Sequence, residues 1–98
     1  MAYINNIRTF VRVYELGNMS AASRDLRISP AVTSTRISQL EEHLGVRLFQ
    51  RTTRHLTPTE QGVNFYRGAV NILDSIELAE AQITDMTENL KGSLYVGA

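Results

Sequence analysis

The first stretch of the chain carries apolar side chains at helical spacing. Five of them follow one another in steps of three, three, one and three, which places them on one face of a helix. They are Ile4, Ile7, Phe10, Val11 and Tyr14. Asn5 or Asn6 can cap the start, and Gly17 can end the helix in a left-handed conformation. The pattern predicts a first helix over residues 5–16.

Two further helices are expected in quick succession. Ser20 is suited to cap a short helix from Ala21 to Arg27. Ser29 is suited to cap the next helix, and Pro30 fits its first position, where the N–H that proline lacks has no partner in any case. The inward face of this third helix is predicted from side chains at helical spacing: Thr33, Ile37, Leu40 and Leu44. We place the helix over residues 30–44, ended by the glycine that follows.

The second and third helices have the sequence form of a helix-turn-helix, because a short turn joins them and the later one begins with small polar residues. A helix that enters a major groove needs a slim N-terminal half, and its free N–H groups favour phosphate. The acids of the third helix, Glu41 and Glu42, lie toward its far end. The alternative is an ordinary three-helix bundle.

A different period follows the third helix. Apolar and polar positions alternate over residues 46–51, and a polar stretch over residues 52–55 precedes another short apolar segment. This pattern predicts a β-hairpin, a wing, whose basic tip is flanked by Arg51 and Arg54. Arginine suits a narrow, electronegative minor groove. The alternative is an exposed loop with two solvated arginines.

A long helix is expected to begin at Thr57-Pro58-Thr59-Glu60, with the first threonine as the cap, proline at the first position and glutamate at the third. No proline interrupts the chain from there to Asn89, and Lys91-Gly92 is expected to close the helix. About 30 residues give a helix ~45 Å long at 1.5 Å per residue. A core of only ~60 residues is too small to cover such a helix.

The apolar positions of this long helix approach a heptad seam with one irregular step. The seam comprises Val63, Tyr66, Val70, Leu73, Ile76, Ala79, Ile83, Met86 and Leu90. A second stripe, with Phe65, Ile72 and Leu78, lies off that seam. One stripe can pack on the preceding helices, whereas the other needs a partner, most simply a second copy. The alternative is that the helix folds back on its own domain. The residues expected at the dimer interface are Val63, Tyr66, Val70, Leu73, Ile76, Ile83 and Met86.

These elements predict a mainly α protein. A winged helix-turn-helix of three helices and a hairpin is expected over residues 1–59, and a dimerisation helix over residues 60–91. Residues 93–98 alternate like a strand that has nothing to pair with. We therefore expect residues 92–98 to begin a further domain of a longer protein.

The charge of the chain is divided unevenly. The 98 residues balance to zero, yet residues 1–59 carry eight arginines against four acids, and residues 60–98 carry two cations against six acids. This split indicates a basic module for a polyanion joined to an acidic spacer, the alternative being a random division of solvated surface charge.

Several other classes of function find no support in the residues. The chain has no cysteine, and its two histidines, His43 and His55, fall in different predicted elements. Nothing resembles a paired acid and base, a glycine-rich phosphate loop or a nucleophile elbow, so we expect no catalysis, no metal and no cofactor. No apolar run reaches the ~20 residues of a membrane span and no signal peptide is evident, so a cytoplasmic protein is expected. A helical protein-interaction adaptor that uses the seam and no nucleic acid is the remaining alternative.

Several runs of residues resemble the N-terminal region of LysR-type transcriptional regulators. They are Gly17-Asn18-Met19-Ser20-Ala21-Ala22, Ser29-Pro30, Leu40-Glu41-Glu42-His43-Leu44-Gly45-Val46-Arg47-Leu48-Phe49-Gln50-Arg51-Thr52 and Leu56-Thr57-Pro58-Thr59-Glu60-Gln61-Gly62. The resemblance implies a winged helix-turn-helix that binds double-stranded DNA at pseudo-palindromic promoter sites, and a linker helix that forms a homodimer. It also implies a C-terminal domain for a small-molecule effector, a bacterial cytoplasmic protein, and tetramers in many full-length members.

The resemblance also implies which residues meet DNA. The expected set is Ser20, Ser29, Pro30, Thr33, Ser34, Arg36, Arg51, Thr52 and Arg54. The chain departs from the family pattern at Ser23, where alanine is usual, and at Val32 and Thr33, where alanine and valine are usual. Thr35 stands where arginine is frequent, and Arg36 is its nearest substitute. These departures leave the base preference open.

Overall fold

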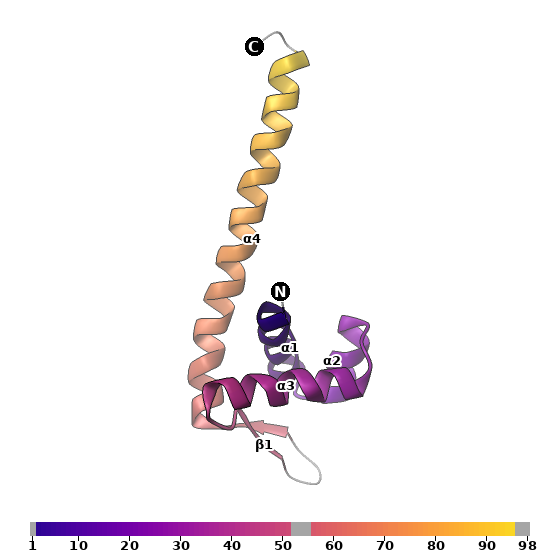
Figure 1. The fold of residues 1–98 in the computed structure, drawn as a ribbon, viewed down its shortest axis with the longest axis vertical. Coiled ribbons are helices and arrows are strands. Elements are labelled where there is room, and N and C mark those ends of the chain that lie inside the picture. Colours follow the sequence, from indigo (N-terminus) through magenta and orange to yellow (C-terminus); the bar gives the residue numbers. More distant parts are fainter. Residues whose placement is uncertain (1, 52–55, 96–98) are drawn as a thin grey trace.

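The computed structural model describes residues 2–51 and 56–95, and the side chains of residues 3–50 and 56–84. Three helices are followed by a two-stranded sheet and a long helix (Figure 1). The elements are α1 (Ala2–Leu16), α2 (Met19–Leu26), α3 (Pro30–Leu44), β1 (Phe49–Arg51), β2 (Leu56–Pro58) and α4 (Glu60–Tyr95). The first five elements form a head, and α4 rises from it, so the chain extends over 63 × 25 × 20 Å.

The second helix starts earlier than predicted. The side chain of Asn18 caps it by accepting a hydrogen bond from the Ala21 N–H at 2.9 Å, so Ser20 is not the cap but an exposed residue of the first turn. Asparagine and serine cap helices about equally well, and the extended backbone of Asn18 decides between them. The helix ends at Leu26, and the next residue, Arg27, adopts a left-handed conformation with φ of 59°.

The predicted bounds of the third helix are confirmed. The Ser29 hydroxyl accepts from the Val32 N–H at 3.1 Å, Pro30 opens the helix, and Gly45 closes it with φ of 72°. The preferences of serine, proline and glycine for these positions depend only on the backbone within a few residues, so the bounds could be predicted from the sequence.

The predicted hairpin is confirmed, with shorter strands. Strand β1 pairs antiparallel with β2 in the register Phe49 to Pro58, Gln50 to Thr57 and Arg51 to Leu56. The tip, which includes Thr52 and Arg54, lies outside the described residues.

The predicted start of α4 was wrong by two residues. Thr59, not Thr57, is the cap, because its hydroxyl accepts from the Gly62 N–H at 3.0 Å and donates to the Arg47 carbonyl at 2.6 Å. Pro58 instead belongs to β2, where the sheet pairing holds it. The helical backbone continues through Tyr95, so Lys91-Gly92 does not close the helix and residues 93–95 do not form a strand. One glycine inside a helix costs only about 1 kcal/mol relative to alanine, which a long helix tolerates.

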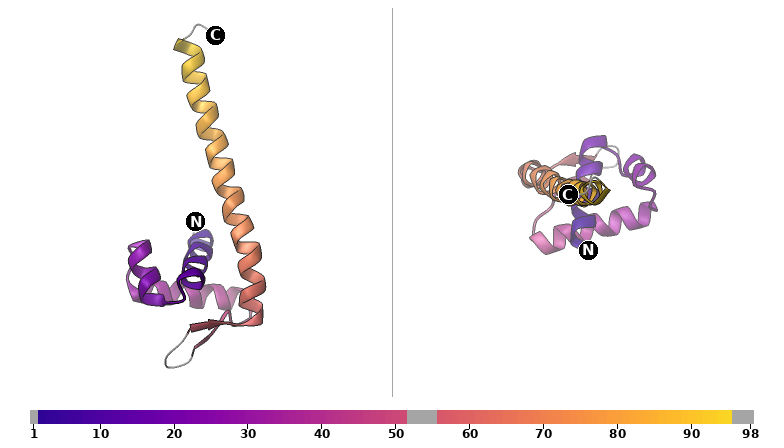
Figure 2. Two further views of the ribbon diagram at one scale, coloured as in Figure 1. Left: turned by 180° about the vertical axis from the view of Figure 1, so that it is seen from behind. Right: turned by 90° about the horizontal axis from the view of Figure 1, so that it is seen from above.

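The hydrophobic core lies between α1, α3, the hairpin and the base of α4. Phe10 is fully buried at its centre, with the rings of Phe49 and Phe65 each 5.4 Å away between centroids. Helix α4 contributes Ala69, which is also fully buried. Beyond its base, α4 extends away from the head (Figure 2), so it does not fold back on its own domain.

Candidate nucleic-acid interface

The outward face of α3 carries short apolar or uncharged polar side chains and no acid over its first three turns. The core-facing side chains of the helix include Thr33, Ile37 and Leu40, which are fully buried. The exposed residues on the opposite face are Ala31, Val32, Thr35, Ser38 and Gln39. A face of this kind can approach a polyanion closely, since it is slim and carries no negative charge.

Four of the predicted DNA-binding residues are accessible on the head. Ser20 lies in the first turn of α2, and Ser29 and Pro30 lie at the start of α3, all exposed. Ser34 is half-buried one turn further along α3. These residues therefore gather around two helix N-termini, where free N–H groups favour phosphate oxygens.

Thr33 was predicted to contact DNA, but its position in the structure does not fit that role. Its side chain is fully buried, and its hydroxyl lies 2.6 Å from the Ser23 hydroxyl and 3.1 Å from the Ser29 carbonyl. Both members of this pair depart from the family pattern described above. The Ser23 hydroxyl likewise donates to the Met19 carbonyl at 2.9 Å, so both buried hydroxyls have backbone partners and their mutual contact joins α2 to α3. Thr33 therefore holds the two helices together and does not face a ligand.

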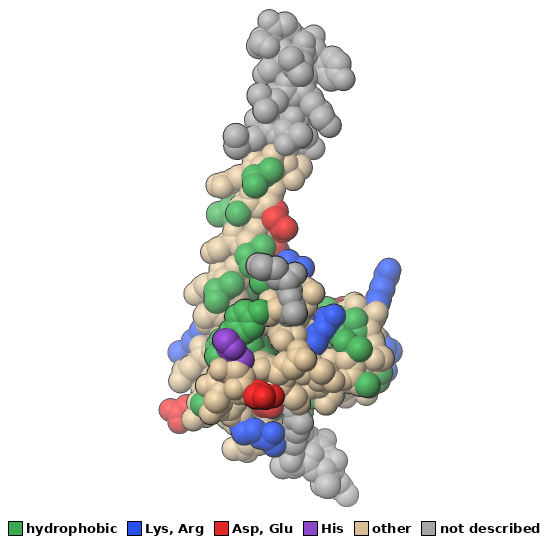
Figure 3. Space-filling model, viewed as in Figure 1, with side chains coloured by type: hydrophobic (Ala, Val, Ile, Leu, Met, Phe, Trp, Pro, Cys, Tyr) green, Lys and Arg blue, Asp and Glu red, His purple; other side chains and the backbone are tan. Residues whose placement is uncertain are grey.

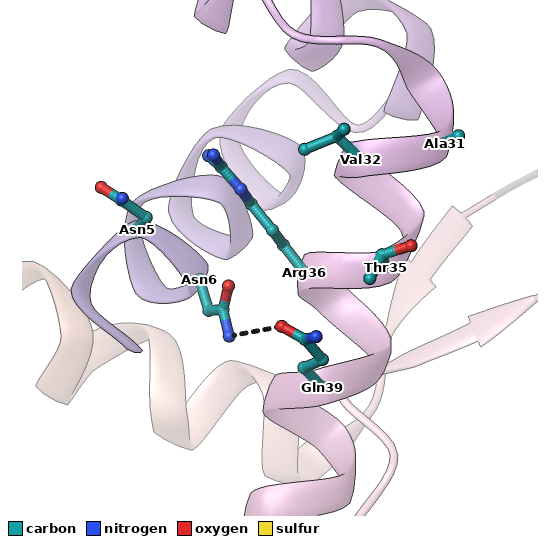
Figure 4. Close-up of a pocket in the computed structure, with 7 residues that line it drawn as sticks. All are labelled: Asn5, Asn6, Ala31, Val32, Thr35, Arg36 and Gln39. Carbon is teal, nitrogen blue, oxygen red and sulfur yellow. Dashed lines mark hydrogen bonds between the residues drawn. The ribbon is translucent and has the colours of Figure 1, made fainter. Parts of the chain in front are cut away.

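Arg36 leans away from the centre of the outward face. Its Nη1 donates to the Thr9 hydroxyl of α1 at 3.3 Å, and the side chain is half-buried. Figure 4 shows it crossing a groove between α1 and α3. The groove has a volume of about 350 Å³, and its lining residues are Asn5, Asn6, Ala31, Val32, Thr35, Arg36 and Gln39. The contact of Arg36 with DNA stays a prediction.

Asn6 and Gln39 form a polar contact that the sequence analysis missed. Asn6 was considered only as a helix cap, yet it lies inside α1 and its Nδ2 donates to Gln39 Oε1 at 3.3 Å (Figure 4). Asn6 is buried although it is an amide, and its position on the face with Ile7 and Phe10 was the available signal.

Glu41 ties α3 to the start of the wing. Its Oε2 accepts from the Leu48 N–H at 2.8 Å and from the Phe49 N–H at 3.4 Å, and the residue is only 7% exposed. Arg47 adds an ion pair at 3.8 Å. From the sequence, Glu41 was predicted only to be an acid that lies away from the N-terminal end of the helix. Its place beside Ile37 and Leu40 on the inward face was the missed signal.

The remaining wing residues are described only in part. The backbone of Arg51 forms the end of β1, whereas its side chain and the whole of Thr52 and Arg54 lie outside the described residues. Figure 3 shows basic side chains on the surface of the head. On the rest of its described part, four arginines are exposed. They are Arg8, Arg24, Arg27 and Arg47.

The predicted dimerisation residues of α4 fall into two groups. Tyr66, Val70 and Leu73 are half-buried and pack against the core of the head, while Val63 and Ile76 are also half-buried. Ile83 is 66% exposed, and the side chain of Met86 lies outside the described part. Apolar side chains continue along α4 above the head in Figure 3. The head thus uses the lower part of the seam.

Two other kinds of site are not found among the described residues. No group of three or more histidine, aspartate or glutamate side chains there is placed to hold a metal ion. None of the described helices combines the length and apolar character that crossing a membrane requires.

Comparison with known proteins then decides the family. The sequence profile of one family, the bacterial regulatory helix-turn-helix proteins of the lysR family, matches residues 4–63. The chain belongs to the LysR family. The resemblance and the mainly α, winged helix-turn-helix fold are thereby confirmed, and this LysR-family chain is the DNA-binding domain of a transcription regulator rather than an enzyme.

Relatives and solved structures agree with this assignment. An HTH-type transcriptional regulator of Haemophilus influenzae is 41% identical over 96 residues, covering 98% of this chain and 33% of the relative. The regulator CrgA of Neisseria meningitidis is 38% identical over 90 residues, covering 92% of this chain and 30% of CrgA. The LysR-family chain thus spans about a third of the length of these relatives.

Among solved structures, the CbnR DBD–DNA complex aligns with a TM-score of 0.80 at 28% identity, over 86% of this chain and 97% of that one. The complex of the BenM DBD with catB site 1 DNA aligns with a TM-score of 0.76 at 31% identity, over 89% and 93% of the two chains.

Proposed function

We propose that this LysR-family chain binds a pseudo-palindromic promoter site as a homodimer, with α3 in the major groove and the wing at the minor groove. The observation that carries the proposal is the outward face of α3, which is slim and acid-free and begins at the capped turn of Ser29 and Pro30. The similarity to CbnR and BenM domains in DNA complexes supports it.

The contacts divide by chemistry. Ser20, Ser29 and Pro30 position the head on phosphates through the N-termini of α2 and α3. Ser34 meets base edges, and Arg36 serves the phosphates beside the groove from its place near α1. Arg51, Thr52 and Arg54 extend the wing toward the minor groove.

The dimer interface uses the part of α4 beyond the head. Its seam positions are spaced by three or four residues, as in a heptad repeat. They are Ile76, Ala79, Ile83, Met86 and Leu90. Tyr66, Val70 and Leu73 already pack on the head, and Val63 is half-buried in the first turn of α4. We therefore assign Ile76, Ile83 and Met86 to the interface with a second copy.

The full-length regulator goes beyond this chain. We infer that it acts in the bacterial cytoplasm at the nucleoid and that a C-terminal domain binds a small-molecule effector. A tetramer of the full-length protein belongs to the same inference.

Selection of bound duplexes from a random pool tests the DNA-binding proposal. We expect one enriched sequence with two inverted half-sites, and an affinity that falls steeply between 50 mM and 200 mM salt, since phosphate contacts release counterions. Arg54→Ala should weaken all duplexes alike, whereas Ser34→Ala should change the preference among sites. A purely interaction-based adaptor would shift no duplex at any salt concentration.

The dimer is tested by paired substitutions on α4. Ile83→Asp should shift the chain from dimer to monomer in sedimentation velocity, because it places a charge in the seam. Leu78→Asp is the matched control, since Leu78 is 61% exposed but lies off the seam. Equal effects of the two substitutions would refute this interface.

A further inference from the structure

A chain of polar contacts joins α4 to the first two helices of the head. The Tyr66 hydroxyl of α4 donates to Glu15 Oε2 of α1 at 2.7 Å. Arg12 donates from Nη1 to Glu15 Oε1 at 2.9 Å and from Nε to Asp25 Oδ2 of α2 at 2.8 Å. The ring of Tyr14 stacks on Tyr66 with centroids 3.9 Å apart and planes 7° from parallel. We call Arg12, Tyr14, Glu15, Asp25 and Tyr66 the clasp.

The clasp contributes orientation more than stability. The Arg12 and Asp25 side chains are 34% and 46% exposed, and ion pairs of that exposure add little to the free energy of unfolding. Hydrogen bonding to Glu15, with a smaller contribution from burial, raises the pKa of Tyr66, the direction expected for a hydroxyl that donates to a carboxylate. A near-parallel ring stack combined with a directed hydrogen bond restricts both the tilt of α4 and its rotation about its axis. The apolar contacts at its base are not directional in this way.

The clasp lies near the base of α4, where a small change in tilt produces a large displacement at the far end of the helix. Tyr66 lies in the second turn of α4, and at 1.5 Å per residue the helix runs on for roughly 40 Å beyond it. The side chains of residues 77–84 are exposed, so the contacts that orient α4 on the head lie near its base. In a dimer joined through α4, a small change in tilt at Tyr66 moves each head by several ångströms.

We propose that the clasp sets the half-site spacing that the dimer accepts, by fixing the direction of α4 relative to the helix-turn-helix. This inference rests on the proposed function, because it requires two heads on one duplex. Recognition helices of such dimers read half-sites one helical turn apart, roughly 34 Å, or multiples of it. One base pair of added spacing moves a half-site by about 3.4 Å along the duplex and rotates it, so a rigid joint discriminates against it.

Tyr66→Phe tests the proposal, because it removes the hydroxyl and keeps the ring. The selected duplex is compared with duplexes whose half-sites are moved apart by one, two and three base pairs, and with a single half-site. We expect the wild-type preference for its own spacing to fall roughly fivefold, the effect of losing one hydrogen bond to a charged group at a partly exposed site, with affinity for the single half-site unchanged. Asp25→Asn, at the other end of the clasp, should act in the same direction.

Tyr14→Phe is the matched control. It also removes one phenolic hydroxyl and keeps the ring, which here is the ring that stacks on Tyr66. In the described part of the chain the Tyr14 hydroxyl makes no hydrogen bond. It should leave the spacing preference unchanged. If Tyr66→Phe does not fold, judged by its circular dichroism, Glu15→Gln takes its place, because it keeps the shape of the side chain but loses the charge that holds Arg12.

The outcomes separate the two proposals. A wild-type chain that binds selected duplexes without any spacing preference would overturn both the clasp and the dimer on two half-sites. A wild type with a sharp preference that Tyr66→Phe retains in full would overturn the clasp alone. A loss of affinity for the single half-site that matches the loss on the paired sites would also overturn it, because the clasp would then only support the fold of the head.

Discussion

The base of α4 and its distal half carry the same kind of apolar pattern but meet different surroundings. At the base, Ala69 is fully buried and Tyr66 and Leu73 pack on the head, whereas Leu78 and Ile83 further along are 61% and 66% exposed. Helical periodicity therefore reports that a helix has an apolar face and does not report what covers it. In this chain one helix both closes the core of the head and carries an exposed apolar pattern above it.

The two regions also differ in how polar groups are used. In the head, Glu41, Ser23 and Thr33 are buried with hydrogen-bond partners, so each of them joins two elements. The described polar side chains of the distal part of α4 are exposed. Substitutions in the head should consequently change the free energy of unfolding, whereas those in the distal half should change association.

The largest expected effect is that of Phe10→Ala. The ring contacts Tyr14, Phe49 and Phe65 at the centre of the core, and its removal should lower the free energy of unfolding by about 3–5 kcal/mol. Leu78→Ala in the distal half should change it by no more than about 0.5 kcal/mol. Urea denaturation of both variants at one protein concentration measures the contrast, which a similar loss at the two sites would contradict.

Two glycines of α4, Gly62 and Gly68, allow the contact with the head to be tested within one helix. A Cβ at Gly62 would overlap the Leu48 carbonyl oxygen, whereas a Cβ at Gly68 meets nothing. We expect Gly62→Ala to destabilise the chain by up to about 3 kcal/mol and Gly68→Ala to stabilise it by about 0.5–1 kcal/mol. Thermal unfolding followed by circular dichroism would show Tm shifts of opposite sign, and two shifts of the same sign would mean that the head does not hold the base of α4 as described.

Glu41 and Glu42 are adjacent, but Glu41 is buried and hydrogen-bonded whereas Glu42 is exposed. Glu41→Ala leaves the Leu48 N–H without its acceptor and should cost about 2 kcal/mol, whereas Glu42→Ala, at an exposed position, should stay within about 0.5 kcal/mol. Chemical denaturation gives both values. Faster amide hydrogen exchange at Leu48 in Glu41→Ala alone would identify the lost hydrogen bond as the cause.

The smallest effect concerns the hydroxyl pair between α2 and α3. Ser23→Ala and Thr33→Val should each destabilise by about 1 kcal/mol, and the double variant should lose less than the sum, because two apolar groups replace two matched polar ones. A double-mutant cycle measures this coupling. Strict additivity would show that the two hydroxyls act independently.

Part of the candidate site could be predicted from the sequence. Ser29, Pro30 and Gly45 defined α3 correctly, because caps and left-handed ends depend on groups within a few residues of one another. Where two local solutions compete, the outcome was not predictable. Asn18 displaced Ser20 as a cap, and Thr59 displaced Thr57 because the sheet engages Pro58.

The amino-acid sequence by itself determined the order of the elements, the helix-turn-helix, the hairpin and the length of α4 beyond any core that the head could provide. Only the tertiary structure decided that Thr33 is internal, that Arg36 lies against α1, and that Tyr66 reaches Glu15. The last two contacts join residues 27 and 51 positions apart. Periodicity and capping act over a few residues, whereas such contacts arise only when packing of the core brings distant helices together.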